Sequence, residues 1–499
     1  MHIVHLCTEI APIAKVGGLA DVVYGLSIEL IKQGHTVEVI LPKYDTIDYS
    51  RLKNLQVHYR ELWSFDGPSS YNNTIWSAEI DQIKILFIEP HHPSYFFSRG
   101  AIYGCADDVD RFLYFTRTAM EFLFKSKRQP DCIHLHDWPV AIASTLHKDM
   151  YIPLGFQAGG LLLTIHNMEH QGRCSPHNLT RIGLTGDYYL TADRYQDPDI
   201  PQVINLLKGG INTADVITTV SPTYKQEILR RPNGHGLEEV LVANQQKIHG
   251  ILNGIDPDFW NPEKDPHLIE KFPPIRSIAQ KNLPQLLKAK EENKKQLCTH
   301  LGLDAARGPL IGCVTRLVPQ KGPALIASAI KHAMQKGALF VLLGSEYSIE
   351  TKKVFEELKK EFSSTRQFGL LLDRNESIAH LIFAGSDFIT VPSIFEPCGL
   401  TQLISLRYGT LPIVRQTGGL ADTVFDVDGH CEEDAKNGIV FKESGKADMD
   451  RAIDRAVKLW GEEKDLFKKL VVNALRCDYS WRVSGQKYIK LYNTLSNKS

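Results

Sequence analysis

Short, continuous runs of hydrophobic residues alternate along the chain with longer segments in which hydrophobic residues recur every three or four positions. The first run covers residues 2–9, the segment 18–34 follows with the helical spacing, and residues 36–42 form the next run. Continuous runs are typical of strands buried on both faces, whereas the longer spacing indicates an amphipathic helix. Residues 2–42 therefore predict one β-α-β unit with a right-handed crossover.

The same alternation recurs along two stretches of the chain. In the first stretch, strands are predicted at 132–135, 161–165 and 216–220, with a helix near 140–147. In the second stretch, strands are predicted at 310–315, 338–344, 368–372, 388–391 and 411–414, and helices at 323–336, 349–362, 377–385 and 400–408. Alternating strands and helices are typical of a parallel sheet with helices on both faces. Each stretch therefore predicts a doubly wound, Rossmann-like α/β domain.

The 499 residues suit two domains, because single hydrophobic cores stop growing near roughly 250–300 residues. Residues 253–307 are rich in Pro, Lys and Asp and predict a linker with surface helices. We therefore expect one Rossmann-like domain over 1–252 and a second over 253–478. Ligands of doubly wound sheets bind beyond the carboxyl ends of the strands, so we expect the site in a cleft between the domains.

Charge and cysteine usage narrow the function classes. Lys+Arg (57) and Asp+Glu (58) nearly cancel, which gives no support for nucleic-acid binding or a polybasic membrane contact. The 9 cysteines show no C-x-x-C spacing and predict buried thiols rather than a disulfide framework or a zinc site. The chain opens on a strand, with no recognisable signal or transit segment, and no apolar run reaches the ~18 residues of a membrane span. We expect a cytoplasmic protein, or a plastid-stroma protein if a transit peptide has been removed.

Two glycine-rich turns follow predicted strands and begin predicted helices. The first, KVGGLAD, covers residues 15–21, and the second, TGGLAD, covers residues 417–422. Glycine lets the backbone approach a ligand closely, and a helix start offers free N–H groups to a phosphate or a sugar. Lys15 adds a mobile cation. A tight turn beside an exposed lysine is the simpler interpretation of either motif taken alone.

Charged side chains follow two strands of the second predicted domain. Arg316 and Lys321 lie in TRLVPQKG, and they could grip the phosphates of a diphosphate or remain two solvated cations. Glu396 precedes a helix start in EPCGLTQ, where Thr401 is a candidate helix cap. Its carboxylate could satisfy the helix dipole, or it could contact a sugar hydroxyl or the transition state.

Histidines and aromatic residues gather in the first predicted domain. His134, His136, Asp137 and Trp138 follow one strand and His166 follows another, which favours hydrogen bonds to a sugar over a metal site or core histidines. Aromatic rings could stack on pyranose rings or pack beneath a long loop. The aromatic residues concerned are Tyr71, Trp76, Tyr95, Phe96, Phe97, Tyr103 and Phe112.

Taken together, the motifs resemble those of bacterial glycogen synthases and plant starch synthases. In chain order they read KVGGLADVV, HLHDW, TIHN, LLKGGI, TTVSPTY, GILNGID, TRLVPQKG, FEPCGLTQL and TGGLADTV. Any one of them is weak, whereas the ordered series across nearly the whole chain is specific. The segments YNNTIWSAEI, FIEPHHPSYFF and YGCADDVDRF are more similar to the third and fourth classes of soluble starch synthase than to the granule-bound class.

The resemblance implies a GT-B fold, in which 1–252 is the acceptor-side domain, completed by the C-terminal helix 479–499, and 253–478 is the nucleotide-sugar-binding domain. It also implies retaining transfer of glucose from ADP-glucose, or less often UDP-glucose, to the non-reducing end of an α-1,4-glucan. It implies neither a metal nor another cofactor, and it leaves the oligomeric state open. The implied catalytic residues are Glu396, His166, Arg316 and Lys321. The implied donor-binding residues are Lys15, Gly18, Asp137, Asn253, Arg374, Cys398, Gly399, Leu400, Thr401, Thr417 and Gly418. Glu9, Asp21, Trp138 and Tyr95 are assigned to the acceptor side.

Four positions depart from the family pattern, namely Ala20, Pro139, His170 and Arg374. Arg374 occupies the tyrosine position beside the nucleotide base, which leaves nucleotide preference open. Two other functions compete with glucan synthesis: transfer to a small acceptor, as in sucrose synthase-like enzymes, and a catalytically weak glucan-binding or initiation protein. Retention of the charged residues argues against the second. A phosphorylase fits poorly, because the chain is short and nothing marks a pyridoxal-phosphate lysine.

Overall fold

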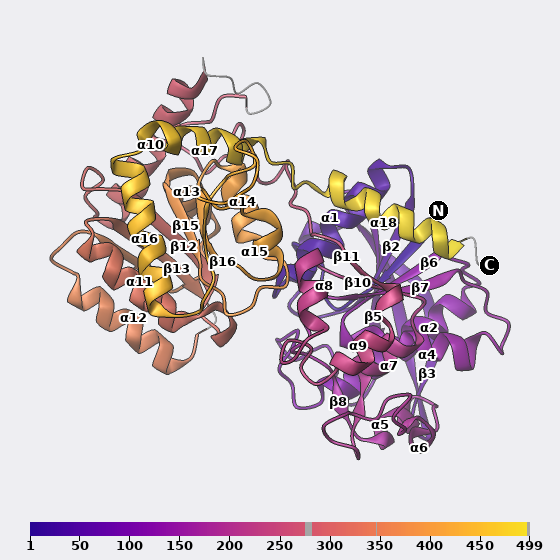
Figure 1. The fold of residues 1–499 in the computed structure, drawn as a ribbon. Coiled ribbons are helices and arrows are strands. Elements are labelled where there is room, and N and C mark those ends of the chain that lie inside the picture. The colour runs from indigo at the N-terminus through magenta and orange to yellow at the C-terminus, as the bar shows by residue number, and fades with distance from the viewer. Residues whose placement is uncertain (275–281, 346, 497–499) are drawn as a thin grey trace. The chain divides into compact units, whose positions relative to one another are not determined.

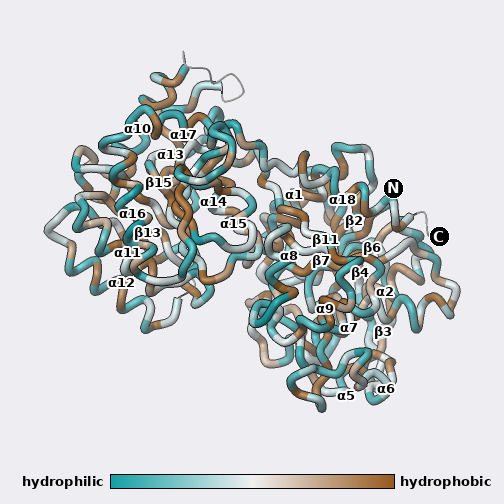
Figure 2. Tube along the Cα trace, viewed as in Figure 1, coloured by the Kyte–Doolittle hydropathy of each residue, from teal (hydrophilic) through white to brown (hydrophobic). Residues whose placement is uncertain are grey.

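The computed structural model describes residues 1–274, 282–345 and 347–496, and it divides into two compact units. Unit 1 consists of Met1–Gly254 and Trp481–Ser499, and unit 2 consists of Ile255–Ser480. Each unit is built on its own sheet (Figure 1). The hydrophobic residues of each unit concentrate along its strands (Figure 2). None of the described helices combines the length and apolar character that crossing a membrane requires.

The sheet of unit 1 has, within the described residues, the strand order β11-β10-β7-β6-β1-β2-β5-β4-β3. All neighbours from β11 to β5 are parallel, whereas β3 and β4 form an antiparallel hairpin beside β5. The bounds are β1 His2–Leu6, β2 Thr36–Pro42, β3 Lys53–Asp66, β4 Ser69–Ile80, β5 Ile83–Pro90, β6 Cys132–His136, β7 Gly160–Ile165, β10 Val216–Thr219 and β11 Ile248–Gly250. A separate pair joins β8 Arg173–Cys174 to β9 Ile204–Asn205.

The helices of unit 1 include two that are central to the site, α1 (Gly18–Lys32) and α3 (Trp138–Ala141). The others are α2 Asp108–Lys125, α4 Ala143–Leu146, α5 Pro176–Arg181, α6 Gly186–Tyr189, α7 Leu206–Thr213, α8 Pro222–Ile228, α9 Glu238–Ala243 and α18 Trp481–Ser496. The last helix, α18, packs on α1 at Gly25, where an added Cβ would lie 1.9 Å from the Trp481 indole nitrogen. Glycine at this position therefore lets the chain's end dock on its first helix.

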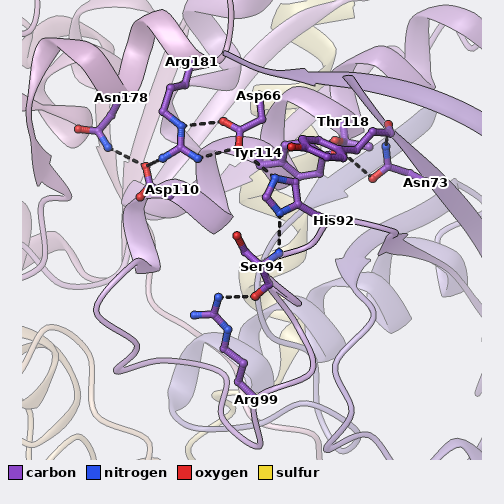
Figure 3. Close-up of polar contacts among 11 residues, drawn as sticks. Asp66, Asn73, His92, Ser94, Arg99, Asp110, Tyr114, Thr118, Asn178 and Arg181 are labelled. Carbon is purple, nitrogen blue, oxygen red and sulfur yellow. Dashed lines mark hydrogen bonds and ion pairs between the residues drawn. The ribbon is translucent and has the colours of Figure 1, made fainter. Parts of the chain in front are cut away.

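A charged network holds the β3–β4 hairpin to the helices beside it (Figure 3). Arg181 on α5 donates to both carboxylate oxygens of Asp66, at 2.7 Å each, and reaches Asp110 on α2 at 2.5 Å. His92 lies 3.0 Å from the same Asp66 carboxylate. Bidentate Arg–carboxylate pairs are among the stronger polar contacts, so Arg181 holds the end of β3 against α2 and α5.

The sheet of unit 2 is parallel, with the order β14-β13-β12-β15-β16-β17. Its strands are β12 Leu310–Arg316, β13 Leu339–Ser345, β14 Phe368–Leu371, β15 Phe388–Val391, β16 Leu411–Arg415 and β17 Ile439–Phe441. Its helices are α10 Leu283–Leu301, α11 Pro323–Gln335, α12 Ile349–Glu361, α13 Glu376–Gly385, α14 Thr401–Arg407, α15 Gly418–Thr423, α16 Lys446–Gly461 and α17 Lys464–Arg476. Numbered along the chain, this is the 3-2-1-4-5-6 order of a doubly wound nucleotide-binding sheet.

The interpretation of 253–307 as a linker with surface helices is wrong for α10. Leu286 and Leu297 of this helix are fully buried, and Lys290 is buried with 6% of its surface exposed. The Lys290 ammonium donates to the carbonyls of Ala384 and Tyr408, at 3.0 and 3.1 Å. The sequence predicted a surface helix because α10 is rich in lysine. Lys290 is nevertheless buried, because its ammonium donates hydrogen bonds to backbone carbonyl groups. Residues 275–281 of this stretch lie outside the described residues.

Candidate active site

Several of the predicted site residues follow the strands at which the strand order of each sheet reverses. In unit 1 the chain builds β2 and β5 on one side of β1 and then returns to add β6 on the other side. In unit 2 the corresponding neighbours are β12 and β15. Ligands of doubly wound sheets bind outside the carboxyl ends of such strand pairs. Glu9 and Asp137 follow β1 and β6, and Lys321 and Glu396 follow β12 and β15.

The glycine-rich turn that begins α1 is organised by the buried carboxylate of Glu9. Its Oε2 accepts hydrogen bonds from the N–H groups of Val16 and Gly17, at 2.6 and 2.9 Å. Its Oε1 accepts a hydrogen bond from the Tyr103 hydroxyl at 2.8 Å. Gly17 is the N-cap residue of α1 and has no side chain that could accept these hydrogen bonds. The Glu9 carboxylate therefore accepts them and holds the turn in place. Sequence reasoning gave Glu9 an acceptor-side role and missed Tyr103 as its partner.

Lys15 lies over the first turn of α1, in an ion pair with Asp21. The Lys15 Nζ and Asp21 Oδ1 are 2.6 Å apart, and the two side chains are 40% and 32% exposed. Ion pairs this exposed contribute about 0.2–1 kcal/mol, so an incoming phosphate can compete for the ammonium. Gly18 is the first residue of α1 and adds no side chain to this surface.

Asp137 joins the ends of β6 and β7. Its N–H donates to the Thr164 carbonyl at 2.9 Å, and its Oδ1 accepts the N–H of His166 at 2.7 Å. Its backbone has φ 63 and ψ −175, a region that residues with a side chain rarely adopt. Burial raises the pKa of Asp137 to about 7, against the opposing effect of the backbone N–H groups of His166 and Asn167. Strain and a perturbed pKa together are typical of a functional position.

Three histidines form a hydrogen-bonded row that ends at His166. Nδ1 of His5 is 2.9 Å from Nε2 of His136, and Nδ1 of His136 is 3.1 Å from Nε2 of His166. Burial lowers the pKa of His5 and of His166 to about 3, and that of His136 well below its usual value. All three rings are therefore neutral near pH 7, and each carries a single N–H hydrogen.

This single hydrogen per ring links the tautomers of the row. The buried Nε2 of His5 has no hydrogen-bond partner. A hydrogen on this Nε2 would be a buried N–H donor without an acceptor, which costs more free energy than a buried nitrogen lone pair without a donor. We therefore assign the hydrogen of His5 to Nδ1. His5 then donates to His136 and His136 donates to His166, which leaves the hydrogen of His166 on its Nδ1. Sequence reasoning found His136 and His166 but not His5, whose position in β1 reads as an ordinary strand residue.

His134 lies against this row without joining it. Its ring centre is 4.2 Å from that of His136. Its Nδ1 is 2.8 Å from the Tyr492 hydroxyl on α18, and its Nε2 is 2.6 Å from Oγ1 of Thr164. Both nitrogens are thus engaged with hydroxyl groups, and His134 serves as a core contact between the sheet and α18.

The aromatic residues of unit 1 divide into core and surface. Phe96, Phe97 and Phe112 are buried, so the packing interpretation holds for them. Trp138 is partly buried, and its ring packs against Phe112 with centroids 5.8 Å apart. Tyr95, in contrast, is 71% exposed in the loop after β5. The acceptor-side role of Trp138 and Tyr95 stays a proposal.

Asn253 lies at the end of the first segment of unit 1 and is 6% exposed. Its side-chain oxygen Oδ1 is buried without a hydrogen-bond partner. An unmatched acceptor inside a protein is costly unless a ligand or water meets it. This observation supports Asn253 as a donor-binding residue.

The centre of the candidate site in unit 2 is an ion pair between Lys321 and Glu396. The Lys321 ammonium contacts Oε2 of Glu396, and the two side chains are 17% and 5% exposed. The Ser393 hydroxyl donates to the same oxygen at 2.7 Å. The carboxylate of Glu396 is thus held by side chains rather than by the helix start that follows it. Ser393 was missed in the sequence, where only its position three residues before Glu396 marks it.

The turn at Gly418 and Gly419 packs closely against the backbone of Glu396. Gly418 has φ +44, and an added Cβ would lie 1.8 Å from the Glu396 carbonyl oxygen. The N–H of Gly419 donates to that same oxygen at 3.1 Å. Gly399, with φ +75, begins the next turn, and Cys398 is buried between them. Thr417 is buried as the N-cap of α15 and offers no side-chain cap. The predicted donor loops 396–401 and 417–418 therefore form one packed structure.

The expectation that Thr401 caps a helix is wrong. Helix α14 begins at Thr401, its N-cap is Leu400, and no side chain caps it. The Thr401 hydroxyl donates instead to the Val314 carbonyl of β12 at 3.4 Å. The hydroxyl turns toward the sheet because residue 401 is already helical, so its side chain cannot reach back to the first N–H groups.

Of the two predicted arginines, Arg316 lies at the carboxyl end of β12, which Lys321 follows, whereas Arg374 follows β14. Arg316 is the last residue of β12, partly buried and in register with Ser345 of β13. Arg374 is exposed in the segment between β14 and α13. Of the four predicted catalytic residues, Lys321 and Glu396 are in direct contact, Arg316 belongs to the same unit, and His166 belongs to unit 1.

The chain is similar to known proteins along its whole length. Residues 2–243 match the starch synthase catalytic domain family, and residues 303–470 match the glycosyl transferases group 1 family. A glycogen synthase from Protochlamydia amoebophila is 48% identical over 100% of both chains. The catalytic domain of starch synthase IV from Arabidopsis thaliana, bound to ADP and acarbose, is 42% identical over 99% of both chains, with a TM-score of 0.93. Sucrose-phosphate synthase from Thermosynechococcus elongatus, at 16% identity over 100% of both chains and a TM-score of 0.62, shares the fold.

Proposed function

The chain belongs to the glycogen and starch synthase family, glycosyltransferases of the GT-B fold, and from this premise we propose that it transfers glucose from ADP-glucose to the non-reducing end of an α-1,4-glucan with retention. The family and the fold predicted from the motifs are confirmed by these relatives. The identity of the nucleotide, the polymer and the roles of the site residues are the content of the proposal.

The observation that carries the proposal is the buried pair of Lys321 and Glu396. A lysine already oriented by a carboxylate at a strand end is a preorganised cation for a diphosphate. When the donor binds, the ammonium can share its hydrogens between a phosphate oxygen and Glu396. Negative charge that develops on the leaving nucleoside diphosphate then meets a fixed positive charge. Arg316, at the end of β12, is proposed as the second cation of this clamp.

The proposed reaction moves one bond and one proton. The acceptor 4-hydroxyl oxygen bonds to the anomeric carbon on the face from which the diphosphate leaves, and the bond from that carbon to the diphosphate oxygen breaks. The hydroxyl proton passes to the departing phosphate oxygen, and ADP is released. The carboxylate of Glu396 and the backbone carbonyl of His166 steady the positive charge of the sugar ring. We assign no covalent nucleophile.

Residues of unit 1 are proposed to orient the transferred glucose. Asp137 holds the N–H of His166 at 2.7 Å, so the two residues move as one element. The histidine row presents Nδ1–H of His166 as a single donor, which suits a sugar hydroxyl oxygen. Positioning of this kind accounts for much of the rate in a transfer without covalent catalysis.

Adenine is proposed as the base because a starch synthase domain 42% identical to this chain binds ADP. Arg374 is proposed to stack on that base, since a guanidinium plane and an aromatic ring attract each other. The predicted cytoplasmic location stays a prediction, and cell fractionation would test it.

Incorporation of labelled glucose into glycogen tests the proposal. The purified chain is given ADP-glucose and UDP-glucose in parallel, and the product is digested with an enzyme specific for α-1,4 links. We expect incorporation from ADP-glucose to exceed that from UDP-glucose, with digestible product. Labelling of glucose or fructose in place of glycogen would favour the small-acceptor function. Glycogen binding without release of nucleoside diphosphate would favour the glucan-binding function.

A further inference from the structure

His380, on α13 of unit 2, is a buried histidine with one unmatched nitrogen. The residue is 1% exposed, and the Trp260 ring stacks on it with centroids 4.3 Å apart. Its Nδ1 is 2.6 Å from Oδ2 of Asp265. Its Nε2 is buried and has no hydrogen-bond partner among the residues that the structure describes. A native protein rarely leaves such a nitrogen unsatisfied without a ligand, an ion or a water.

The contacts of Asp265 decide which nitrogen of His380 carries the hydrogen. The Tyr408 hydroxyl donates to Oδ2 of Asp265 at 2.5 Å. The carboxylate also accepts the N–H of His267 at 2.9 Å. Because the Asp265 carboxylate is already the acceptor in both of these contacts, we assign the donor of its contact with His380 to Nδ1 of the imidazole. Its Nε2 is therefore a buried lone pair.

Two further ligand groups converge on this lone pair. One ligand atom each of His267, Glu376 and His380 lies within 4.8 Å of the others. Glu376 precedes His380 by one helical turn of α13 and shares its face. The His267 ring is centred 4.7 Å from that of His380. The burial falls from His380 through the partly buried His267 to the exposed Glu376, which leaves the group accessible from solvent.

We propose that His267, Glu376 and His380 bind one divalent transition-metal ion, for which Zn²⁺ is the best match, with solvent completing the coordination. Two imidazoles and one carboxylate are an established ligand set for Zn²⁺. Asp265 occupies the position of the outer carboxylate that fixes the tautomer and ring orientation of a metal-bound histidine. The ion would tie residues 265–267 to α13, and no step of the proposed glucose transfer runs through it.

Metal titration of the full chain tests the site. The chelator-treated protein is titrated with Zn²⁺ against a chromophoric competitor, and Co²⁺ is added separately, because its visible spectrum separates four-coordinate from six-coordinate ions. The test variants are His267→Gln and Glu376→Gln, which change partly buried and exposed side chains and so spare the core. The matched controls are His300→Gln, an exposed histidine of α10, and Glu350→Gln, an exposed first-turn glutamate of α12.

We expect the native chain and both controls to bind one equivalent of Zn²⁺ and to melt at a higher temperature in its presence. Each test variant should bind it at least about 10-fold more weakly and lose the thermal shift. Equal affinity in all five proteins would overturn the proposal. Loss of binding after alkylation of the free cysteines, with the test variants unaffected, would also overturn it by assigning the ion to thiols.

Discussion

The ammonium of Lys321 is ion-paired with the carboxylate of Glu396, although 75 positions separate the two residues in the chain. The two residues lie on the segments that follow β12 and β15, the neighbouring strands at which the strand order of the unit 2 sheet reverses. Because Glu396 is almost fully buried, its charge depends on Lys321 and on the Ser393 hydroxyl. The ion pair thus contributes to stability and is also proposed to act in catalysis, and variants can separate these two roles.

Lys321→Ala should reduce both stability and activity. It leaves the Glu396 carboxylate buried without its cation, which costs about 3 kcal/mol in the free energy of unfolding. Loss of the cation beside the diphosphate should lower kcat about 100-fold or more. Urea unfolding and the rate of ADP release measure the two effects.

The double variant Lys321→Ala/Glu396→Gln provides the control for that prediction. With no buried charge left, most of the lost stability should return, whereas kcat should stay low. Lys331→Ala, which removes an exposed pair with Glu361, should change neither quantity. Wild-type turnover in Lys321→Ala would remove the clamp from the proposed mechanism.

Asp137→Asn should change how stability depends on pH. The folded-state pKa of Asp137 is raised from 3.8 to about 7, so the folded chain binds more protons than the unfolded chain between these values. This contribution to stability is complete below pH 3.8 and is lost as the pH rises through 7. The asparagine variant should lack this decline and be more stable than wild type at pH 8, by about 1–2 kcal/mol after allowance for solvent screening. Thermal melts across pH 5–8 measure it, and parallel curves for the two proteins would contradict the raised pKa.

His136→Phe should alter the tautomer of His166. Without the donor from His136, the hydrogen of His166 is no longer confined to Nδ1, and ¹⁵N NMR of the imidazoles should show a mixture. Loss of orientation should lower kcat about 10-fold or more. His134→Phe is the matched control, because His134 is equally buried but bonds to Tyr492 and Thr164. A purely structural role for the row predicts equal stability losses and an unchanged His166 tautomer in both variants.

Gly418→Ala should destabilise unit 2 through a backbone clash. The new Cβ would lie 1.8 Å from the Glu396 carbonyl oxygen, so the segment carrying the carboxylate must shift, at about 2–3 kcal/mol. Gly337→Ala is the control, since Gly337 has φ +79 and no atom within 4 Å of an added Cβ. It should cost only the conformational strain, about 1 kcal/mol. Equal losses of unfolding free energy for the two variants would show that the clash is relieved without displacing Glu396.

The strands of both sheets could be predicted because burial on two faces leaves a simple signal. The runs at 36–42 and 388–391 match β2 and β15 to the residue. The first run was predicted to reach residue 9, but β1 ends at Leu6, because the segment after it folds back in a bridge between Ile10 and Ala14. The hairpin of β3 and β4 escaped prediction, since β3 is mostly exposed and lacks a regular alternation of buried positions.

The location of the candidate site could be predicted, but its internal contacts could not. Glycine pairs and charged residues after strands mark the turns where a ligand can approach, and Lys321 and Glu396 were found in this way. The contact of Tyr103 with Glu9 and the role of His5 were missed because their partners are distant in sequence, and Ser393 was missed because a lone serine carries no recognisable pattern. Such pairings depend on which strands become neighbours, and that order is fixed by the fold rather than by any local pattern.

The position of α18 in unit 1 affects the order in which the two units can fold during synthesis. Trp481 fits against Gly25 of α1, and Tyr492 meets His134 in β6, so the final residues complete the core of the part that is synthesised first. A ribosome that has released only the first 254 residues leaves that surface uncovered. Unit 2, whose residues 255–480 are continuous in the chain, can finish folding before the segment that forms α18 is synthesised. Until residues 481–496 have been translated, the surface that α18 covers on unit 1 stays open, and a chain truncated near residue 480 would keep it open.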